Sequence, residues 1–144
     1  MHLAWLVLVA SRLSLVPSFL PPVPYDWTNG LWRPMRILLL RSPRYVWPFN
    51  SETSAFWQPL GLLCLAAAVR RDLPGAQVEV WDCPGEKCGW KTLEARLAAR
   101  RIDVLGVGEE TVSAHEAIRA AQLVKRLWPD CTVVAGGVYF AHAI

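Results

Sequence analysis

The sequence predicts an α/β fold in which helices cover both faces of a doubly wound parallel sheet. Strand-length apolar runs alternate with longer helical segments from Met35 to the end of the chain. Continuous apolar runs of this length are typical of parallel strands that are buried on both faces. Because strand–helix–strand crossovers are right-handed, four such strands joined by three helices are expected to form one sheet.

The first strand and the first helix are both strongly apolar. Residues 37–40 have the sequence "ILLL", and we expect the first strand there. After a polar loop, Pro59 begins "PLGLLCLAAAVRR", which is too long for a strand. Proline is favoured at the first position of a helix, where the N–H that it lacks would have no partner. Pro74 and Gly75 end this helix.

The second and third strands enclose a short helix. In "AQVEVWD", residues 76–82, two valines alternate with Glu79, as in a strand. In "TLEARLAARR", residues 92–101, Leu93 and Leu97 are four positions apart and share one helix face. The sequence "IDVLGVG", residues 102–108, then predicts the third strand.

The last predicted helix begins at Ser113 and is followed by the fourth strand. Glu116 stands three positions after Ser113, which predicts a capping box in which each side chain bonds the other's backbone N–H. Pro129 ends the helix, and "CTVVAGG", residues 131–137, is the fourth strand. The predicted apolar stripe of this helix consists of Ile118, Ala121, Val124 and Leu127.

Residues 1–34 differ in character from the rest of the chain. Their first part is apolar but contains Arg12, which would cost about 2.5–3.5 kcal/mol at the centre of a membrane helix. Prolines between positions 17 and 24 then block regular structure. Three interpretations stay open: sequence translated from too early a start, a poorly structured leader, and a weak signal-anchor. We expect this leader to add nothing to the fold, and the domain to span residues 35–144.

The composition excludes several classes of protein. A hydrophobic content of 53% with 19% charged residues excludes a disordered chain. The net charge of +3 is spread along the sequence, so nucleic-acid binding is not expected. The four cysteines form no zinc-ligand set, and we interpret them as reduced structural thiols of a cytoplasmic protein. A disulfide between Cys83 and Cys88, or a redox role for this pair, stays open.

Ligands of parallel α/β sheets bind beyond the carboxyl ends of the strands. The loop 41–58 after the first strand contains no glycine, so the fingerprint of dinucleotide-binding folds is missing. Asp82 stands where an acid could bind a ribose, but a single acid is a weak signal. A phospho-receiver domain would place acidic residues after the first and third strands, where residues 38–41 and 107–108 have none.

Three segments together resemble a known family. "MRILLLRSP", "PLGLLCLAAAVRRDLPGAQVEVWD" and "DVLGVGEETVSAHEAIRAAQLVKRLWPDCTVVAGGVYFAH" resemble the N-terminal cobalamin (B12)-binding domain of radical SAM enzymes, and they occur in the same order and spacing. The resemblance covers Met35 to about Ala143. It implies a Rossmann-like domain that holds the corrinoid, and a chain that stops after the fourth of five strands.

The resemblance also implies what this chain would lack. In the family, a following barrel domain carries a CxxxCxxC motif for a [4Fe-4S] cluster and cleaves S-adenosylmethionine, and many members are methyltransferases. No CxxxCxxC motif occurs here. The expected function is therefore that of a cobalamin-binding fragment with no catalytic residues and no metal ligands of its own, normally continuous with a radical SAM domain. We expect no association with membranes.

The resemblance indicates two groups of cofactor-binding residues. Gly136 and Gly137, followed by Val138, would lie beside the nucleotide tail of the corrinoid, because glycine lets the backbone approach a bulky ligand closely. A small hydroxyl residue often follows the third strand in the family. Here Gly108 takes that place, and Thr111 is the nearest substitute.

Two aromatic residues of the first loop, Tyr45 and Trp47, could pack on the corrin face or could simply cover the edge of the sheet. The loop 41–58 contains no histidine, so we expect cobalt to have no histidine ligand from it. Two other functions stay open: a non-catalytic remnant that binds nothing, and a small α/β module that binds a nucleotide or a protein partner.

Overall fold

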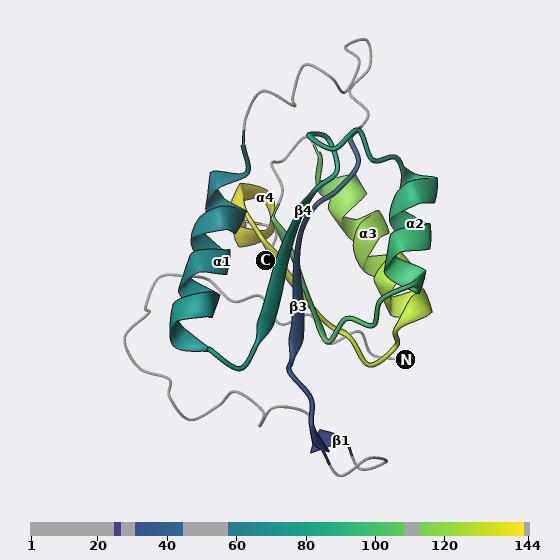
Figure 1. Ribbon diagram of the computed structural model, residues 1–144. Helices are drawn as coiled ribbons and strands as arrows, with labels where there is room; N and C mark the ends of the chain where they lie inside the picture. Colours follow the sequence, from purple (N-terminus) through teal and green to yellow (C-terminus); the bar gives the residue numbers. More distant parts are fainter. Residues whose placement is uncertain (1–24, 27–30, 45–57, 109–112, 143–144) are drawn as a thin grey trace.

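A computed structural model describes residues 25–26, 31–44, 58–108 and 113–142 of the chain (Figure 1). Its centre is a four-stranded, fully parallel sheet with the order β4-β3-β5-β6. The strands are β3 (Arg36–Arg41), β4 (Gln77–Asp82), β5 (Val104–Gly108) and β6 (Thr132–Gly136). The predicted α/β architecture is confirmed, and each strand lies within one or two residues of its predicted position.

The helices divide between the two faces of the sheet. One face carries α1 (Leu60–Asp72), and the other carries α2 (Trp90–Ala98) and α3 (Ala114–Leu127) (Figure 1). The chain moves outward from β3 to β4, and then returns past β3 to β5 and β6. The direction of strand addition therefore reverses between β3 and β5, which is the topological switch point beside which ligands bind in open α/β sheets.

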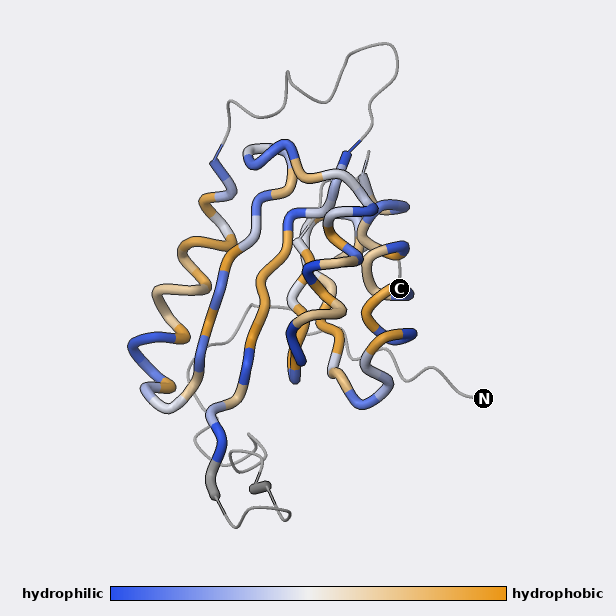
Figure 2. The backbone as a smooth tube through the Cα atoms, turned by 45° about the vertical axis from the view of Figure 1, so that its right-hand side comes forward, coloured by the Kyte–Doolittle hydropathy of each residue, from blue (hydrophilic) through white to orange (hydrophobic). Residues whose placement is uncertain are grey.

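A small apolar core lies beneath α1. Leu62 and Ala66, one turn apart, are the buried residues of this helix. They pack on side chains of β3 and β4, and Figure 2 shows that β3 is apolar over nearly its whole length. The sheet residues of this core are Met35, Ile37, Leu39 and Val78.

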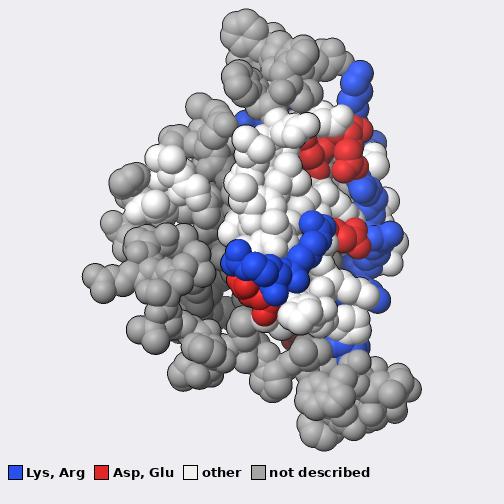
Figure 3. All heavy atoms as spheres, turned by 60° about the vertical axis from the view of Figure 1, so that its left-hand side comes forward, with Lys and Arg blue, Asp and Glu red and all other residues white. Residues whose placement is uncertain are grey.

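The outer surface of α1 is also apolar. Its sequence has no charged residue before Arg70, and Leu60 and Leu65 are 67% and 51% exposed. Figure 3, which brings the side of the molecule with α1 forward, shows uncharged atoms over a broad part of this face. A helix that is apolar all round is typical of one that is covered on more than one side, yet the described core occupies only one side of α1.

The larger core lies between the sheet and the other two helices. Leu93 and Leu97 of α2 are fully buried in it, as their spacing predicts. The buried face of α3 differs from the predicted stripe, because it is built from small residues that allow close approach to the sheet and to α2. The buried residues of α3 are Ala114, Ala117, Ala120, Ala121, Leu123 and Val124, whereas Ile118 and Leu127 are only partly buried.

The prediction of a capping box at the start of α3 is wrong. Ser113 does precede the helix, but its side chain makes no capping hydrogen bond. Its φ of −120° and ψ of 16° differ from the extended conformation that capping residues usually adopt. The side chain is nevertheless buried and has an interaction partner elsewhere.

The end of the leader is attached to the domain. Residues Tyr25–Asp26 (β1) and Leu31–Trp32 (β2) form a short antiparallel pair. Both terminal nitrogens of Arg33 donate to the Asp103 carboxylate, which also accepts the backbone N–H of Arg36. Regular structure therefore starts before Met35. The prediction for residues 1–24 lies outside the described residues, and no helix within the described ranges is long and apolar enough to cross a membrane.

Candidate ligand site at the carboxyl ends of the strands

The register of the sheet brings four predicted strand ends into one row. Arg41 pairs with Asp82 across β3 and β4, and Gly108 pairs with Gly136 across β5 and β6. The row therefore has a charged half and a glycine half, and the switch point lies between them. Because this is the edge where open α/β sheets bind ligands, we take it as the candidate site.

The charged half of the row is buried and paired. Arg41 is only 6% exposed, and its Nη1 donates to Oδ1 of Asp82 at 3.3 Å. Ser42, the next residue, is fully buried, and both Arg41 and Ser42 have further interactions. A buried guanidinium needs charge compensation, and the Asp82 carboxylate contributes to it through this contact. This partner weakens the interpretation of Asp82 as a ribose-binding acid.

In the glycine half of the row, the physical reason for having glycine differs from one position to the next. A Cβ on Gly108 would lie 3.2 Å from Cδ2 of Leu62, so the missing side chain at Gly108 lets α1 pack closely on β5. Gly137 has a φ of 102°, a left-handed conformation that disfavours any other residue. Among the described residues, a Cβ on Gly136 would have no neighbouring atom within 4 Å. Neither the packing of the described residues nor a left-handed backbone conformation therefore explains the glycine at position 136.

An apolar rim follows the glycines. Val138 and Tyr139, at the start of α4 (Val138–His142), are 66% and 37% exposed. The ring of Tyr139 stands edge-on to that of Phe140, with 5.2 Å between their centroids. The sequence predicted Val138 at this place, whereas the exposed tyrosine was missed, although it stands in the same segment "GGVYFAH".

The other predicted site residues are not placed. Tyr45 and Trp47 lie in the segment 45–57, and Thr111 lies in 109–112, all outside the described residues. The structure therefore brings together Gly108, Gly136, Gly137 and Val138, and leaves the aromatic and hydroxyl contacts as predictions. His115 is exposed near the start of α3.

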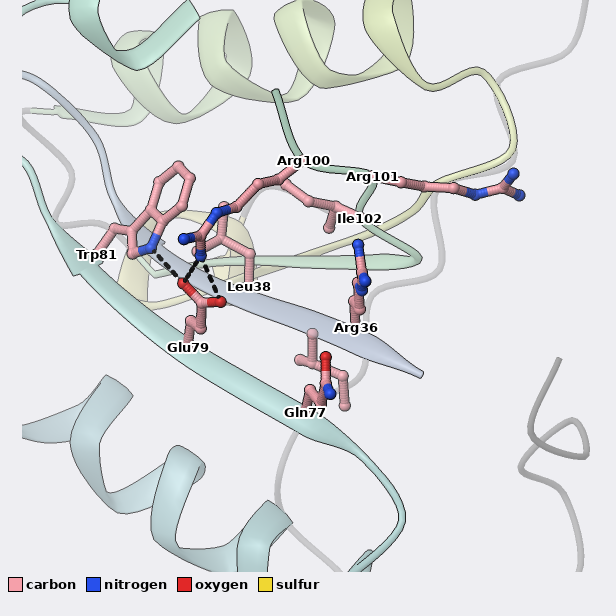
Figure 4. A pocket seen from close by; sticks show the side chains of 9 residues that line it. Arg36, Leu38, Gln77, Glu79, Trp81, Arg100, Arg101 and Ile102 are labelled. Atoms are coloured by element: carbon pink, nitrogen blue, oxygen red, sulfur yellow. Dashed lines mark hydrogen bonds and ion pairs between the residues drawn. The ribbon is translucent and has the colours of Figure 1, made fainter. Parts of the chain in front are cut away.

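A separate hollow of about 200 Å³ lies at the opposite end of β3 and β4 (Figure 4). Arg36 and Gln77, which begin these strands, line it together with Glu79, Trp81 and the arginines that follow α2. The carboxylate of Glu79 already has hydrogen-bond partners within the protein, since it accepts hydrogen bonds from Arg100 at 2.8 Å and from the Trp81 indole at 3.0 Å. The hollow shares no residue with the row formed by Arg41, Asp82, Gly108 and Gly136 at the carboxyl edge.

The described part of the chain contains no group of three or more His, Cys, Asp or Glu residues that could hold a metal ion. No protein-family model, no curated protein and no solved structure matches the chain. The fold and the edge define an α/β domain with a parallel sheet of order β4-β3-β5-β6 and a candidate ligand site between β3 and β6.

Proposed function

We propose that this chain is a cobalamin-binding domain of the kind that precedes the catalytic domain of radical SAM enzymes. The sequence resemblance from Met35 onward suggests this cofactor. The observation that carries the proposal is Gly136, which stands at the carboxyl edge and whose Cβ would meet no atom within 4 Å among the described residues. A backbone that is bare at such a place permits close approach of a broad ligand.

The residues at the edge suit the chemistry of a corrinoid. A corrin is a wide, largely apolar ring with amide groups at its periphery, and it carries a nucleotide tail. Val138 and Tyr139 offer apolar surface next to the glycines, and the tyrosine hydroxyl offers a hydrogen bond to an amide. The tail would lie along Gly136 and Gly137, neither of which carries a side chain of its own.

In the proposed role, this domain binds and orients the cofactor and supplies no catalytic side chain. The bound cobalamin would supply the organometallic chemistry. A [4Fe-4S] cluster and S-adenosylmethionine would belong to a companion radical domain. Because the loop 41–58 contains no histidine, cobalt is expected to lack a protein imidazole ligand.

A titration of the full chain with hydroxocobalamin tests the proposal. We expect saturable binding of one cofactor per chain, with a change in the corrin absorbance bands. We also expect that FMN and ATP do not displace the cobalamin. The variants His115→Ala and His142→Ala should give the same bound spectrum as the wild type, since neither residue is expected to ligate cobalt.

Each other outcome identifies an alternative. A folded chain that binds none of the three compounds would support the non-catalytic remnant and overturn the proposal. Preferential binding of FMN or ATP would instead support a nucleotide-binding module. A changed spectrum in either histidine variant would show that an imidazole reaches cobalt, which would contradict the predicted ligation.

A further inference from the structure

Cys83 and Cys88 are two buried thiols in one short loop between β4 and α2. They are 1% and 6% exposed and belong to the same apolar cluster as Trp81 and Leu93. Both are free thiols. Cys64, which is also free, is exposed and lies on the other face of the sheet in α1. Neither the fold nor the proposed cobalamin site requires two buried thiols so close together in one loop.

The backbone of the loop holds the two cysteines together. The N–H of Cys88 donates to the carbonyl of Cys83 at 2.8 Å, and so closes a ring of six residues. Within the ring, Lys87 has a φ of 52°, which is uncommon for a residue with a side chain. A disulfide requires Cα atoms about 4.4–6.8 Å apart, and a direct backbone hydrogen bond between two residues is compatible with that range.

The two sulfur atoms also influence each other. Burial, followed by the neighbouring Cys88 thiol through its charge and its hydrogen bond, raises the pKa of Cys83 well above its ordinary value. Cys83 is therefore a neutral thiol at physiological pH. The two thiols therefore lie near enough to interact electrostatically, which agrees with the backbone hydrogen bond that holds the two cysteines together.

Arg96 of α2 places a positive charge near both thiols. Its guanidinium lies beside Cys88, donates to Glu86 of the loop, and stacks 4.3 Å from the centroid of the Trp81 ring. Cys88 also precedes Gly89, the N-cap residue of α2. A cation and a helix N-terminus are surroundings that favour attack by a cysteine sulfur. Cys88, which is the less buried of the two and stands next to the N-cap residue of α2, is thus suited to react first, and Cys83 to react second.

We propose that Cys83 and Cys88 form a reversible dithiol–disulfide site that is oxidised by low-molecular-weight disulfides. In the first step, the Cys88 thiolate attacks the disulfide RSSR, forms a mixed disulfide and releases RS⁻. In the second step, Cys83 loses its proton and attacks the sulfur of Cys88, which releases the second RS⁻. The two protein thiols are oxidised to one disulfide, and RSSR and the two thiol protons become two molecules of RSH.

The formation of the disulfide is tested on the wild-type chain, so this measurement does not depend on the folding of a variant. The chain is equilibrated in buffers of reduced and oxidised glutathione, quenched in acid, alkylated and digested with trypsin without reduction. Trypsin cuts after Lys87, between the two cysteines, so the expected disulfide joins peptide 72–87 to peptide 88–91. We expect this pair to appear as the oxidised fraction rises, and to disappear on return to reduced glutathione.

The other thiols are internal controls. Exposed Cys64 should carry only a mixed disulfide with glutathione, and buried Cys131 should stay unmodified. Arg96→Gln should slow the loss of free Cys88 several-fold without abolishing the final disulfide. If the joined peptides are absent in fully oxidised glutathione while Cys64 is modified, the proposed site is refuted. A pairing that involves Cys64 or Cys131 would refute it equally.

The pH dependence gives a second readout. Because the pKa of Cys83 is raised, the second step should accelerate about tenfold per pH unit below that pKa. A closure rate that does not change between pH 6 and pH 9 would contradict the assigned order of attack. Formation of this disulfide needs no cobalamin, so its failure and the failure of the proposed function are distinguishable.

Discussion

The bond between Arg33 and Asp103 predicts how the end of the leader contributes to stability. Arg33 donates through both terminal nitrogens, one of them at 3.0 Å, and Asp103 also accepts the Arg36 N–H at 2.9 Å. The side chains are 27% and 13% exposed, so solvent screens the pair only partly. A hydrogen bond to a charged group contributes about 1.5–3 kcal/mol, with the lower end appropriate to such partly exposed pairs.

We expect Arg33→Ala to lower the free energy of unfolding by about 1–2 kcal/mol. Asp103→Ala should cost about 2–4 kcal/mol, because it also leaves the Arg36 N–H without its acceptor. For a chain of this size, 1 kcal/mol corresponds to roughly 3–5 °C in melting temperature. The double variant should lose less than the sum of the single losses, since both substitutions remove the same pair. A chain beginning at Met35 should behave like Arg33→Ala or be less stable.

The pH dependence of the same bond has a defined sign. Burial alone would raise the pKa of Asp103, but the hydrogen bonds from Arg33 and Arg36 outweigh it and lower the pKa below the ordinary value of 3.8. The stabilisation is therefore present above pH 3.8 and is lost as the pH falls through the folded-state pKa. The difference between wild type and Arg33→Ala should shrink in acid. Strictly additive losses at pH 7, or a melting temperature unchanged by Arg33→Ala, would refute the assigned role.

Three further predictions concern packing and reactivity. Leu97→Ala should cost about 2–5 kcal/mol in denaturant unfolding, because Leu97 is fully buried, whereas Leu65→Ala should change stability by less than about 0.5 kcal/mol. Gly106→Val should cost at least about 1–3 kcal/mol, since even its Cβ would lie 2.6 Å from a leucine methyl of β3; wild-type stability would contradict this packing. Burial raises the pKa of Cys131 to about 11, so iodoacetamide should modify Cys64 first at pH 8, and faster labelling of Cys131 would refute its burial.

The sequence predicted the strands well because burial on both faces leaves a local pattern. A run such as residues 37–40 needs no knowledge of its neighbours to be assigned. The helix faces were harder to predict, because alanines carry little hydrophobic signal. Ala117 and Ala120 are fully buried in α3, where the position of the sheet and α2, rather than side-chain size, selects the buried face.

The candidate site was predictable only in part. The double glycine after β6 stands out in the sequence, but the contact that explains Gly108 comes from Leu62, which is far away in the chain. The bond between Arg33 and Asp103 spans 70 positions and leaves no local pattern. The adjacency of Cys83 and Cys88 was suggested by their spacing, whereas their burial and the nearby Arg96 depend on the packing of α2.

The most direct test of the proposed function is the affinity of a Gly136→Leu variant for cobalamin, measured by equilibrium dialysis beside Gly75→Leu. A Cβ at either position would meet no atom within 4 Å in the part of the chain that the structure describes, so we expect both variants to keep the wild-type fold and circular dichroism spectrum. Of these two glycines, only Gly136 lies at the carboxyl edge, where it pairs with Gly108. We expect Gly136→Leu to weaken cobalamin binding at least tenfold and Gly75→Leu to leave it unchanged. Equal binding by the two folded variants would contradict the assignment of this edge.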